Sequence, residues 1–408
     1  MQTHACFTHL IVFLGLAFCQ SNLTVQVPPQ YAYLLPRPFN STFAQPFVDT
    51  LLPAGRVNDT ITSARHASFV SYDPEFDTII GNDPTVVELA SSNTSFAFEG
   101  GLWIPPLNQI WFTAFLDPIP GYLSILDLNT STVFQPTLSG PAANIPQNPN
   151  GLAFNSRDGL VYMTSFGSTT TSTTIVSINP TTYETTEIVN SFYGLPLNGP
   201  DDLTFATSRT TNQQCLFFSD FYFAAEGLQG TWAGPQQLPN ALWRFTPATK
   251  TLQMAISPLD VQTPNGLAVD KDNTVLYVTD GPDPAVFGEP YTASSSSSPG
   301  IYAFDLGGED GCTPTNKRLL GIARQGFANG IKVDDQGRIW TAEYEGVVVR
   351  DANGKVLGLF NAVDILQNAN ITDVATIANF ALAGDRLVWL GFNKIYSIQL
   401  GQTVKTWY

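Results

Sequence analysis

Oxygen-bearing side chains recur at one position of an internal repeat in this 408-residue chain. The position is occupied in turn by Glu99, Asn150, Asp201, Asn265, Asn329 and Asn379. Two carboxylates and four carboxamides offer hard oxygen donors without sulfur or imidazole, which is the ligand type that Ca²⁺ prefers and zinc does not. If the fold brings these positions to one axis, they predict a calcium site, with Asp202 as a further carboxylate beside Asp201.

The repeat itself is visible as closely similar segments. NGLAFNSRDGLVYMTSF begins at Asn150, NGLAVDKDNTVLYVTDG at Asn265 and NGIKVDDQGRIWTAEY at Asn329. Weaker copies begin at Glu99, Asp201 and Asn379, so that successive copies start 51, 51, 64, 64 and 50 residues apart. Each copy reads as an alternating apolar strand, a polar turn and a second strand, followed by more strand-like sequence. About four strands in a copy is the content of one propeller blade.

The sequence therefore predicts an all-β protein, a six-bladed β-propeller in one domain. We expect the propeller to span 76–408, with the segment TIIGNDPTVVEL (78–89) supplying a strand that closes the ring against the last blade. Residues 21–75, rich in Pro and glycosylation sequons, are interpreted as an N-terminal extension or strap. Two insertions, 223–240 and 281–300, either have no function or form a partial lid over the axial pocket.

In a propeller the first strand of each blade lines the central channel, so the six recurring residues should converge on the axis. The alternative is that Asn-Gly merely forms a turn, because both residues tolerate positive φ. That alternative accounts for Asn150-Gly151, Asn265-Gly266 and Asn329-Gly330, but not for Glu99 and Asp201 in the same register.

A second recurring position lies at the end of the second strand of each copy. It holds Ala114, Ser165, Asp220, Asp280, Glu343 and Phe392. For Asp220 and Asp280 we expect a structural role, because an Asp at a strand end commonly caps a turn. Glu343 remains open between that role and support of the axial residues through hydrogen bonds.

The N-terminal sequence predicts a secreted protein. Residues 10–18, LIVFLGLAF, have the length of a signal-peptide apolar region, so residues 1–20 are interpreted as that peptide. Cys215 and Cys312 remain after the leader, and in an oxidising compartment we expect them to form one disulfide, with two buried free thiols as the alternative. Six Asn-x-Ser/Thr sequons are candidate glycosylation sites: Asn22, Asn40, Asn58, Asn93, Asn129 and Asn370.

Composition excludes several classes of function. With 18 Lys and Arg against 34 Asp and Glu, the net charge of −16 argues against a nucleic-acid partner. After the leader no apolar run is long enough to predict a membrane span. His66 is the single histidine beyond residue 20, which argues against Ser-His-Asp and Cys-His catalysis. A metal ion with carboxylates beside it is the chemistry that remains.

These motifs resemble the gluconolactonase/regucalcin (senescence-marker) superfamily of calcium-dependent six-bladed propellers. The resemblance covers roughly 97–400 and rests on PNGLAVDKDNTVLYVTDG (264–281), FEGGLW (98–103), PDDL (200–203) and ANGIKVDDQGRIWTA (328–342). The secreted form with an N-terminal extension looks most like fungal lactonohydrolases. The resemblance implies hydrolysis of a small-molecule lactone with a divalent metal, Ca²⁺ or another, as cofactor.

The resemblance also implies roles for individual residues. Glu99, Asn265 and Asn329 match the family's metal ligands, and Asp201 matches its substrate-side Asn. We add Asp201 to the expected metal ligands and expect Asn150 and Asp201 to contact substrate. Two departures stand out, because Asn329 replaces the family's usual Asp and Pro200-Asp201-Asp202-Leu203 replaces its P-N-D-L. A carboxylate has thus moved to the neighbouring blade, which leaves Asp201 or Asp202 as the candidate catalytic base.

Three functions from different classes are compatible with this sequence. The first is a secreted, calcium-dependent lactone hydrolase with carboxylate-activated water. The second is a propeller enzyme of natural-product biosynthesis that performs cyclisation, condensation or a specialised lactone hydrolysis. The third is a non-catalytic propeller that calcium stabilises and whose long loops bind a partner.

Overall fold

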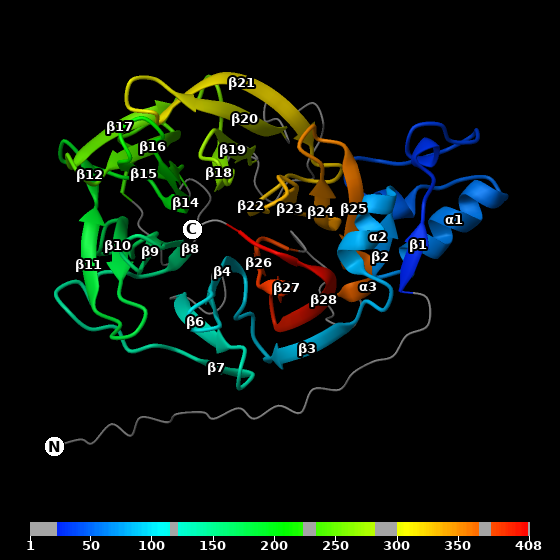
Figure 1. Cartoon of the computed structure of the whole chain (residues 1–408), viewed down its shortest axis with the longest axis horizontal. Helices are drawn as coiled ribbons and strands as arrows, with labels where there is room; N and C mark the ends of the chain where they lie inside the picture. Colours follow the sequence, from blue (N-terminus) through cyan, green and yellow to red (C-terminus); the bar gives the residue numbers. More distant parts are fainter. Residues whose placement is uncertain (1–22, 115–120, 223–233, 282–299, 367–376, 407–408) are drawn as a thin grey trace.

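Six antiparallel sheets surround one axis in the computed structural model (Figure 1). The structure describes residues 23–114, 121–222, 234–281, 300–366 and 377–406. The predicted six-bladed propeller is confirmed. The predicted signal peptide, the sequons at Asn22 and Asn370 and most of the two insertions lie outside the described residues.

Blades 1 to 3 follow the repeat in chain order. Blade 1 holds β4 (Glu99–Ile104), β5 (Gln109–Ala114), β6 (Tyr122–Asp127) and β7 (Thr132–Phe134). Blade 2 holds β8 (Pro149–Asn155), β9 (Leu160–Ser165), β10 (Thr174–Ile178) and β11 (Thr185–Val189). A hairpin of β12 (Ser191–Phe192) and β13 (Leu195–Pro196) precedes blade 3, which holds β14 (Pro200–Thr207), β15 (Gln214–Asp220), β16 (Ala241–Thr246) and β17 (Thr251–Ile256).

Blades 4 to 6 complete the ring. Blade 4 holds β18 (Pro264–Val269), β19 (Val275–Asp280), β20 (Gly300–Gly307) and β21 (Thr313–Ile322). Blade 5 holds β22 (Ile331–Val333), β23 (Ile339–Glu343), β24 (Gly346–Arg350) and β25 (Val356–Asn361), followed by α3 (Ala362–Ile365). Blade 6 holds β26 (Phe380–Leu382), β27 (Gly384–Gly391), β28 (Lys394–Val404) and the earlier strand β3 (Val86–Ser91).

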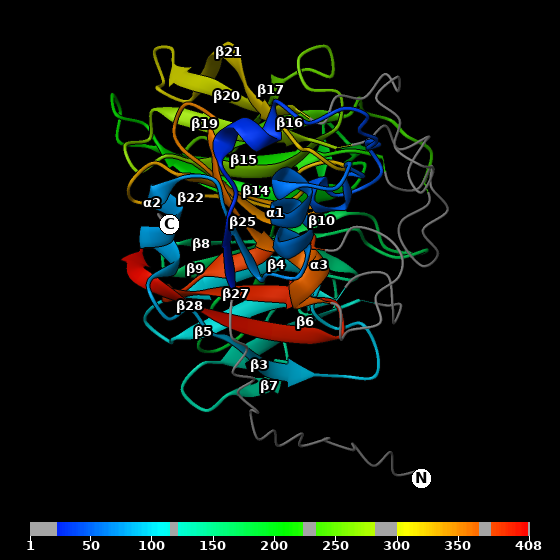
Figure 2. The same cartoon turned by 90° about the vertical axis from the view of Figure 1, so that its right-hand side faces the viewer.

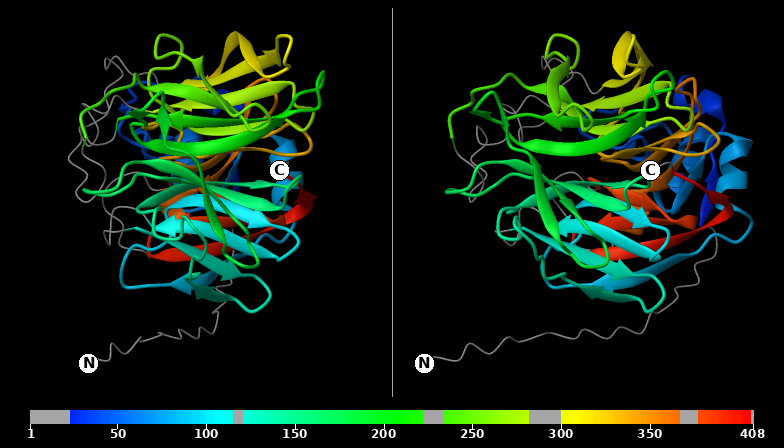
Figure 3. Two further views of the ribbon diagram at one scale, coloured as in Figure 1. Left: turned by 90° about the vertical axis from the view of Figure 1, so that its left-hand side faces the viewer. Right: turned by 60° about the vertical axis from the view of Figure 1, so that its left-hand side comes forward.

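The hydrophobic core is divided among the interfaces between successive blades. Leu102 and Trp111 of blade 1 pack with Phe154 of blade 2, for example, in one of the buried clusters. Alternating strands bury both faces of each sheet between its two neighbours, because a blade has another blade on either side. Viewed from the side, blades 1 to 3 follow one another without intervening helices (Figure 3). This packing fixes the spacing of the inner strands, the first strand of each blade.

The ring closes through pairing of β3 with β28, so that the last blade contains a strand from before the first one. The closing strand begins at Val86, later than the sequence suggested, because Thr78–Ile80 belongs to α2 (Pro74–Ile80). Asp73 explains the helix, since its carboxylate accepts the Glu75 amide N–H at 2.9 Å and Pro74 occupies the first helical position.

The N-terminal extension is joined to blade 5 rather than wrapped loosely around the ring. Its strands β1 (Thr24–Gln26) and β2 (Phe69–Ser71) pair with each other in parallel, and β2 pairs with β25. The 3₁₀ turns η1 (Pro29–Ala32) and η2 (Phe47–Asp49) and helix α1 (Arg56–Arg65) cover the outer side of this sheet (Figure 2). No helix among the described residues is long and apolar enough to span a membrane.

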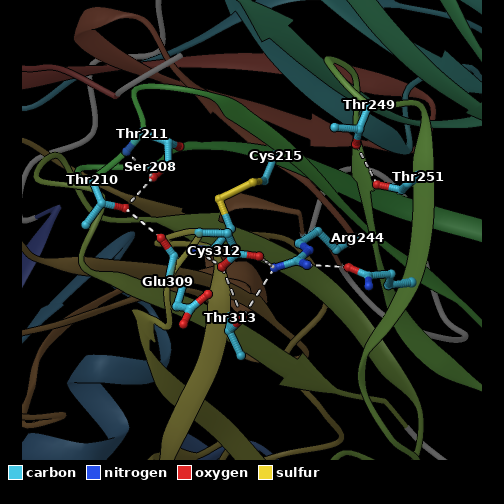
Figure 4. A network of polar contacts seen from close by, with 12 residues as sticks. Ser208, Thr210, Thr211, Cys215, Arg244, Thr249, Thr251, Glu309, Cys312 and Thr313 are labelled. Carbon is cyan, nitrogen blue, oxygen red and sulfur yellow. Dashed lines mark hydrogen bonds and ion pairs between the residues drawn. A yellow bond between two sulfur atoms is a disulfide. The ribbon is translucent and has the colours of Figure 1, made fainter.

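Cys215 and Cys312 form the expected disulfide. Cys215 lies on β15 of blade 3, whereas Cys312 lies in the turn between β20 and β21 of blade 4, so the bond joins neighbouring blades. Polar contacts surround it (Figure 4), since Arg244 of blade 3 pairs with Asp310 at 2.5 Å and the Thr210 hydroxyl donates to the Glu309 carbonyl at 3.3 Å. The disulfide therefore reinforces a blade interface that hydrophobic packing already defines.

Candidate metal and catalytic centre

The six recurring residues lie where the inner strands begin, at one end of the central channel. Their convergence is visible in contacts between distant blades. The Glu99 carboxylate accepts one hydrogen bond from the Asn329 amide and one from the Asn379 amide, both at 3.3 Å. Glu99 also raises the pKa of Asp201, two blades away, by charge repulsion. The sequence repeat thus brings the predicted residues together.

The glycines that follow the axial asparagines have a purpose other than a turn. Gly151, Gly266 and Gly330 do not adopt positive φ, so the turn explanation of Asn-Gly is wrong here. A Cβ on Gly151 would lie 2.2 Å from the Asp201 carbonyl oxygen, and one on Gly266 would lie 2.2 Å from the Asn329 carbonyl oxygen. Glycine is required because the backbone of the next blade passes too close for a side chain.

Glu99 and Asp201 are buried carboxylates without full compensation. Burial raises the pKa of Glu99 to about 8, with the charge of Asp202 adding to the shift and the amides of Asn379 and Asn329 opposing it. Burial also raises the pKa of Asp201 well above its ordinary value, followed by repulsion from Glu99 and Asp202. Among the described residues no hydrogen-bond donor reaches the Asp201 carboxylate.

Asp202 occupies the position that is glycine in neighbouring repeats, and its carboxylate is held by backbone. Its Oδ1 accepts the Leu203 N–H at 2.9 Å and its Oδ2 accepts the Leu267 N–H of blade 4 at 3.4 Å. Burial raises the pKa of Asp202, and the ammonium of Lys332 opposes that rise. Backbone hydrogen bonds therefore hold the Asp202 carboxylate in place, whereas no described donor holds the Asp201 carboxylate.

Lys332 was not identified from the sequence. It lines the central channel with residues of all six inner strands, and burial lowers its pKa while the charges of Asp202 and Glu99 oppose that change. The signal was present in the repeat, because Lys332 stands where the blade 2 and blade 4 copies have Ala153 and Ala268. A lysine in an apolar inner strand marks a place where the fold must balance negative charge.

The residues of this centre fit a divalent cation. The carboxylates of Glu99, Asp201 and Asp202 are all buried, and Lys332 interacts with the charges of Glu99 and Asp202, which leaves two negative charges uncompensated when all four groups are ionised. The Oδ1 oxygen of Asn265 is buried and has no hydrogen-bond partner among the described residues. An orphaned amide oxygen beside carboxylates suits a hard cation such as Ca²⁺.

This centre is not a closed cage of acidic ligands. Within the part of the chain that the structure describes, no three His, Cys, Asp or Glu side chains are grouped as metal ligands would be. A cation held here would need oxygen donors besides carboxylates, and the carboxamides of Asn265 and Asn329 are the predicted ones. Neutral amide oxygens are acceptable to Ca²⁺, which also takes carbonyl oxygens and water.

The residues at the ends of the second strands hold the segments that lead into the inner strands. The Asp220 carboxylate accepts the amide N–H groups of Asn198 and Gly199 at 3.1 and 2.7 Å. The Asp280 carboxylate accepts the N–H of Thr263 at 2.8 Å, and the Ser165 hydroxyl accepts that of Gln147 at 2.9 Å. Asp220 and Asp280 thus have the structural role expected of them.

Glu343, which the sequence left open, is also structural. Its Oε1 accepts a hydrogen bond from the Thr341 hydroxyl at 2.7 Å and pairs with Arg350 at 2.5 Å, all inside blade 5. Arg350 continues to the Ile322 carbonyl at 3.1 Å. A buried ion pair of this kind stabilises the sheet locally, because removing one partner would leave the other charge buried without a counter-charge.

Comparison with known protein families gives a match that covers most of the axial residues. Residues 99–375 match the family described as the SMP-30/Gluconolactonase/LRE-like region, which is well over half of the chain. The chain belongs to this family. The match begins at Glu99, the first residue of the repeat, and spans all the axial residues except Asn379.

Named members of the family resemble the chain over most of its length. The lactonohydrolase oryL of Aspergillus oryzae is 26% identical, with 88% of this chain and 79% of the relative covered. The gluconolactonase of Zymomonas mobilis is 24% identical, covering 71% of this chain and 76% of the relative.

Solved structures show the same propeller. A gluconolactonase from Xanthomonas campestris superimposes with a TM-score of 0.61 at 20% identity, over 81% of this chain and 94% of the other. Regucalcin from Agrobacterium tumefaciens, described as a calcium-binding protein, superimposes with a TM-score of 0.52 at 16% identity, over 79% and 95%. At this identity the likeness establishes the fold.

The raised pKa of Asp220 predicts a pH-dependent contribution to stability. Burial raises its pKa to about 7 from an unfolded value near 4, so the folded protein retains a proton that the unfolded chain releases. Relative to Asp220→Asn, the wild type should lose free energy of unfolding between pH 4 and pH 7, by up to about 1.4 kcal/mol per pH unit. Above pH 7 the difference between the two proteins should be constant.

Urea unfolding of both proteins at several pH values measures this difference. Asp280, whose pKa burial raises to about 6, and the axial carboxylates are common to both proteins, so their contributions cancel. A difference that does not change with pH would show that Asp220 is already ionised in the folded protein at pH 4.

Proposed function

We propose that this protein is a secreted, calcium-dependent hydrolase that opens a small-molecule lactone. The observation that carries the proposal is the axial centre, where buried carboxylates exceed the available positive charge and Asn265 presents an unpartnered oxygen. Membership of the SMP-30/Gluconolactonase/LRE-like family supports it, as do relatives named lactonohydrolase and gluconolactonase.

Glu99, Asn265, Asn329 and Asp201 would hold the cation. Bound there, Ca²⁺ would supply Lewis-acid chemistry at the ester carbonyl and stabilise negative charge on its oxygen. The protein's own contribution is to place oxygen donors from four blades at one point before substrate arrives, which removes the cost of reorganisation. The two hydrogen bonds that side-chain amides donate to Glu99, each 3.3 Å long, are weak enough to be exchanged for a stronger contact.

Asp201 is the better candidate for the base that activates water. Its carboxylate accepts no hydrogen bond from the described residues, so it can take up a proton without breaking one. Asp202 is held by the Leu203 and Leu267 amides and lies in the field of Lys332, all of which favour its ionised form. In the cation-free protein, burial and repulsion from Glu99 and Asp202 favour the protonated form of Asp201.

Asn150 completes the proposed site on the substrate side. Its side chain is buried on β8, and no described residue forms a hydrogen bond with it. A carboxamide that can both donate and accept is suited to hydroxyl groups of a sugar-like lactone. We propose that Asn150 orients substrate next to Asp201 of the neighbouring blade.

The first test is hydrolysis of a panel of small lactones by wild type and Glu99→Gln. Wild-type turnover should disappear on chelation and return with added Ca²⁺. Glu99→Gln replaces a charged ligand with a neutral one and should weaken calcium binding by roughly a hundredfold, with turnover lost in parallel. Calorimetric titration and initial rates at saturating Ca²⁺ measure the two effects.

Glu345→Gln is the matched control for this experiment. Glu345 is a buried glutamate of blade 5 whose pKa burial raises to about 7, but its carboxylate accepts the Phe47 amide N–H away from the axis. It should leave calcium affinity unchanged. Calcium-dependent melting without turnover on any lactone would contradict the hydrolase and favour a non-catalytic or biosynthetic propeller.

The second test separates the two aspartates. Asp201→Asn should lower kcat by roughly 100-fold to 10,000-fold, the usual contribution of a general base. Asp202→Asn should retain kcat within about tenfold, because this carboxylate contacts backbone rather than water or substrate. A larger loss in Asp202→Asn would assign the base to Asp202, and equal losses would contradict the assignment to Asp201. The pH dependence of kcat in each active variant provides an independent measurement.

Secretion is the remaining part of the proposal. Among the sequons in described segments, Asn40, Asn93 and Asn129 are exposed and Asn58 is partly exposed, so each can accept a glycan without unfolding. The disulfide between blades 3 and 4 also suits an oxidising compartment. Protein from the culture medium should begin after residue 20 and lose mass on deglycosylation. Retention in the cell with an intact N-terminus would contradict secretion.

A further inference from the structure

Each of the first four blades carries a hydroxyl that reaches the axial residue of the next blade. The donors are Thr113 on β5, Thr164 on β9, Ser219 on β15 and Thr279 on β19, here called the hydroxyl series. They donate to the backbone carbonyls of Asn150, Asp201, Asn265 and Asn329, at 2.9, 2.7, 2.7 and 2.9 Å respectively. All four hydroxyl groups are buried.

Three of these hydroxyls also bind their own blade. Thr164 accepts the Gly151 N–H at 2.8 Å, Ser219 accepts the Asp202 N–H at 3.0 Å, and Thr279 accepts the Gly266 N–H at 2.8 Å. Each hydroxyl therefore connects the residue after one axial position to the carbonyl of the following axial position. The connection runs through the backbone and is independent of the axial side chain.

The glycines make this connection tight. The Asn329 carbonyl that Thr279 binds is the one that approaches Gly266 too closely for a Cβ, and the Asp201 carbonyl has the same relation to Gly151. The carbonyl is thus confined between a glycine backbone and a hydroxyl of the preceding blade. Confinement of the peptide unit limits rotation about the axial residue, and with it the direction of its side chain.

The series stops where the ring reaches Glu99. At the corresponding positions blade 5 has Ala342 and blade 6 has Gly391, neither of which carries a hydroxyl. The axial residues of blades 6 and 1, Asn379 and Glu99, consequently receive no such bond. They contact each other through side chains alone, at 3.3 Å. The ring thus has four axial residues whose carbonyl accepts a hydroxyl of the preceding blade. For the other two, Asn379 and Glu99, the preceding blade offers no hydroxyl at this position.

We propose that Ser219 and Thr279 are positioning residues for the metal site, each acting through the backbone of an amide ligand in the next blade. Ser219 sets the orphaned oxygen of Asn265, and Thr279 sets the amide of Asn329. Glu99 lies outside the hydroxyl series. This inference rests on the proposed calcium site and gives Ser219 and Thr279 a role that the resemblance to the family does not assign to them.

The test compares Ser219→Ala and Thr279→Val with Thr113→Val, using Ca²⁺ itself as the probe. Thr113 makes the same kind of bond, but to Asn150, which is not a proposed metal ligand. Each substitution removes one buried hydroxyl, so all three should lower the melting temperature. Ser219→Ala and Thr279→Val should in addition weaken calcium binding by roughly fivefold to tenfold, the equivalent of one neutral hydrogen bond. Thr113→Val should bind calcium as wild type does and raise KM.

Thr279→Ser completes the set, because it restores the hydroxyl without the methyl group and should recover wild-type calcium affinity. Calorimetric titration gives the affinity, and melting with and without Ca²⁺ gives the same quantity in any variant that folds. Equal calcium affinity in all variants, with melting temperatures lowered alike, would overturn the positioning role and leave a purely structural one. No calcium binding by wild type would overturn the proposed site first, and the positioning role with it.

Discussion

The burial of negative charge around one axis is the constraint on which the rest of this structure depends. Glu99, Asp201 and Asp202 are each buried, and Lys332 in the channel balances part of the charge of Glu99 and Asp202. Charges removed from water repel strongly unless they are paired, so such a group persists only if the surrounding backbone cannot relax away from it. The six-bladed ring supplies that rigidity, because every inner strand is packed between two neighbours.

The ring is reinforced unevenly, and the asymmetry follows the chemistry. The disulfide joins blades 3 and 4, and the hydroxyl series fixes the axial backbone of blades 2 to 5. The N-terminal extension adds two strands to blade 5, and β3 closes blade 6. Between these supports lies Glu99, whose carboxylate accepts two hydrogen bonds of 3.3 Å from side-chain amides of the described residues.

Family membership and site geometry carry different parts of the functional argument. The fold is shared with a gluconolactonase and a regucalcin, yet a propeller by itself supports many chemistries. The departures in this chain are local, with Asn at position 329 and adjacent aspartates at 201 and 202. Structure distinguishes those aspartates where sequence could not. The Asp202 carboxylate accepts the backbone N–H groups of Leu203 and of Leu267 in the next blade, whereas no described donor reaches the Asp201 carboxylate.

Much of this protein could be predicted from sequence because its repeat is regular. Spacing and alternation of the copies gave the six blades, and the shared register of Glu99, Asn150, Asp201, Asn265, Asn329 and Asn379 gave the axial centre. The pairing of Cys215 with Cys312 followed from there being two cysteines beyond the leader. Local chemistry was misread where two signals competed. Thr78–Ile80 looked like a strand by composition, but the Asp73 cap and Pro74 make it a helix.

Tertiary structure decided what depends on neighbouring blades. Three of these features are relations between different sheets. Gly151 and Gly266 leave room for a carbonyl oxygen of the next blade rather than form a turn. Lys332 faces Asp202, and the Thr279 hydroxyl binds the Asn329 carbonyl. A one-dimensional pattern states which residues share a register, since the repeat period is local to the chain. It does not state how closely two blades approach, because that distance is set by the packing of the whole ring.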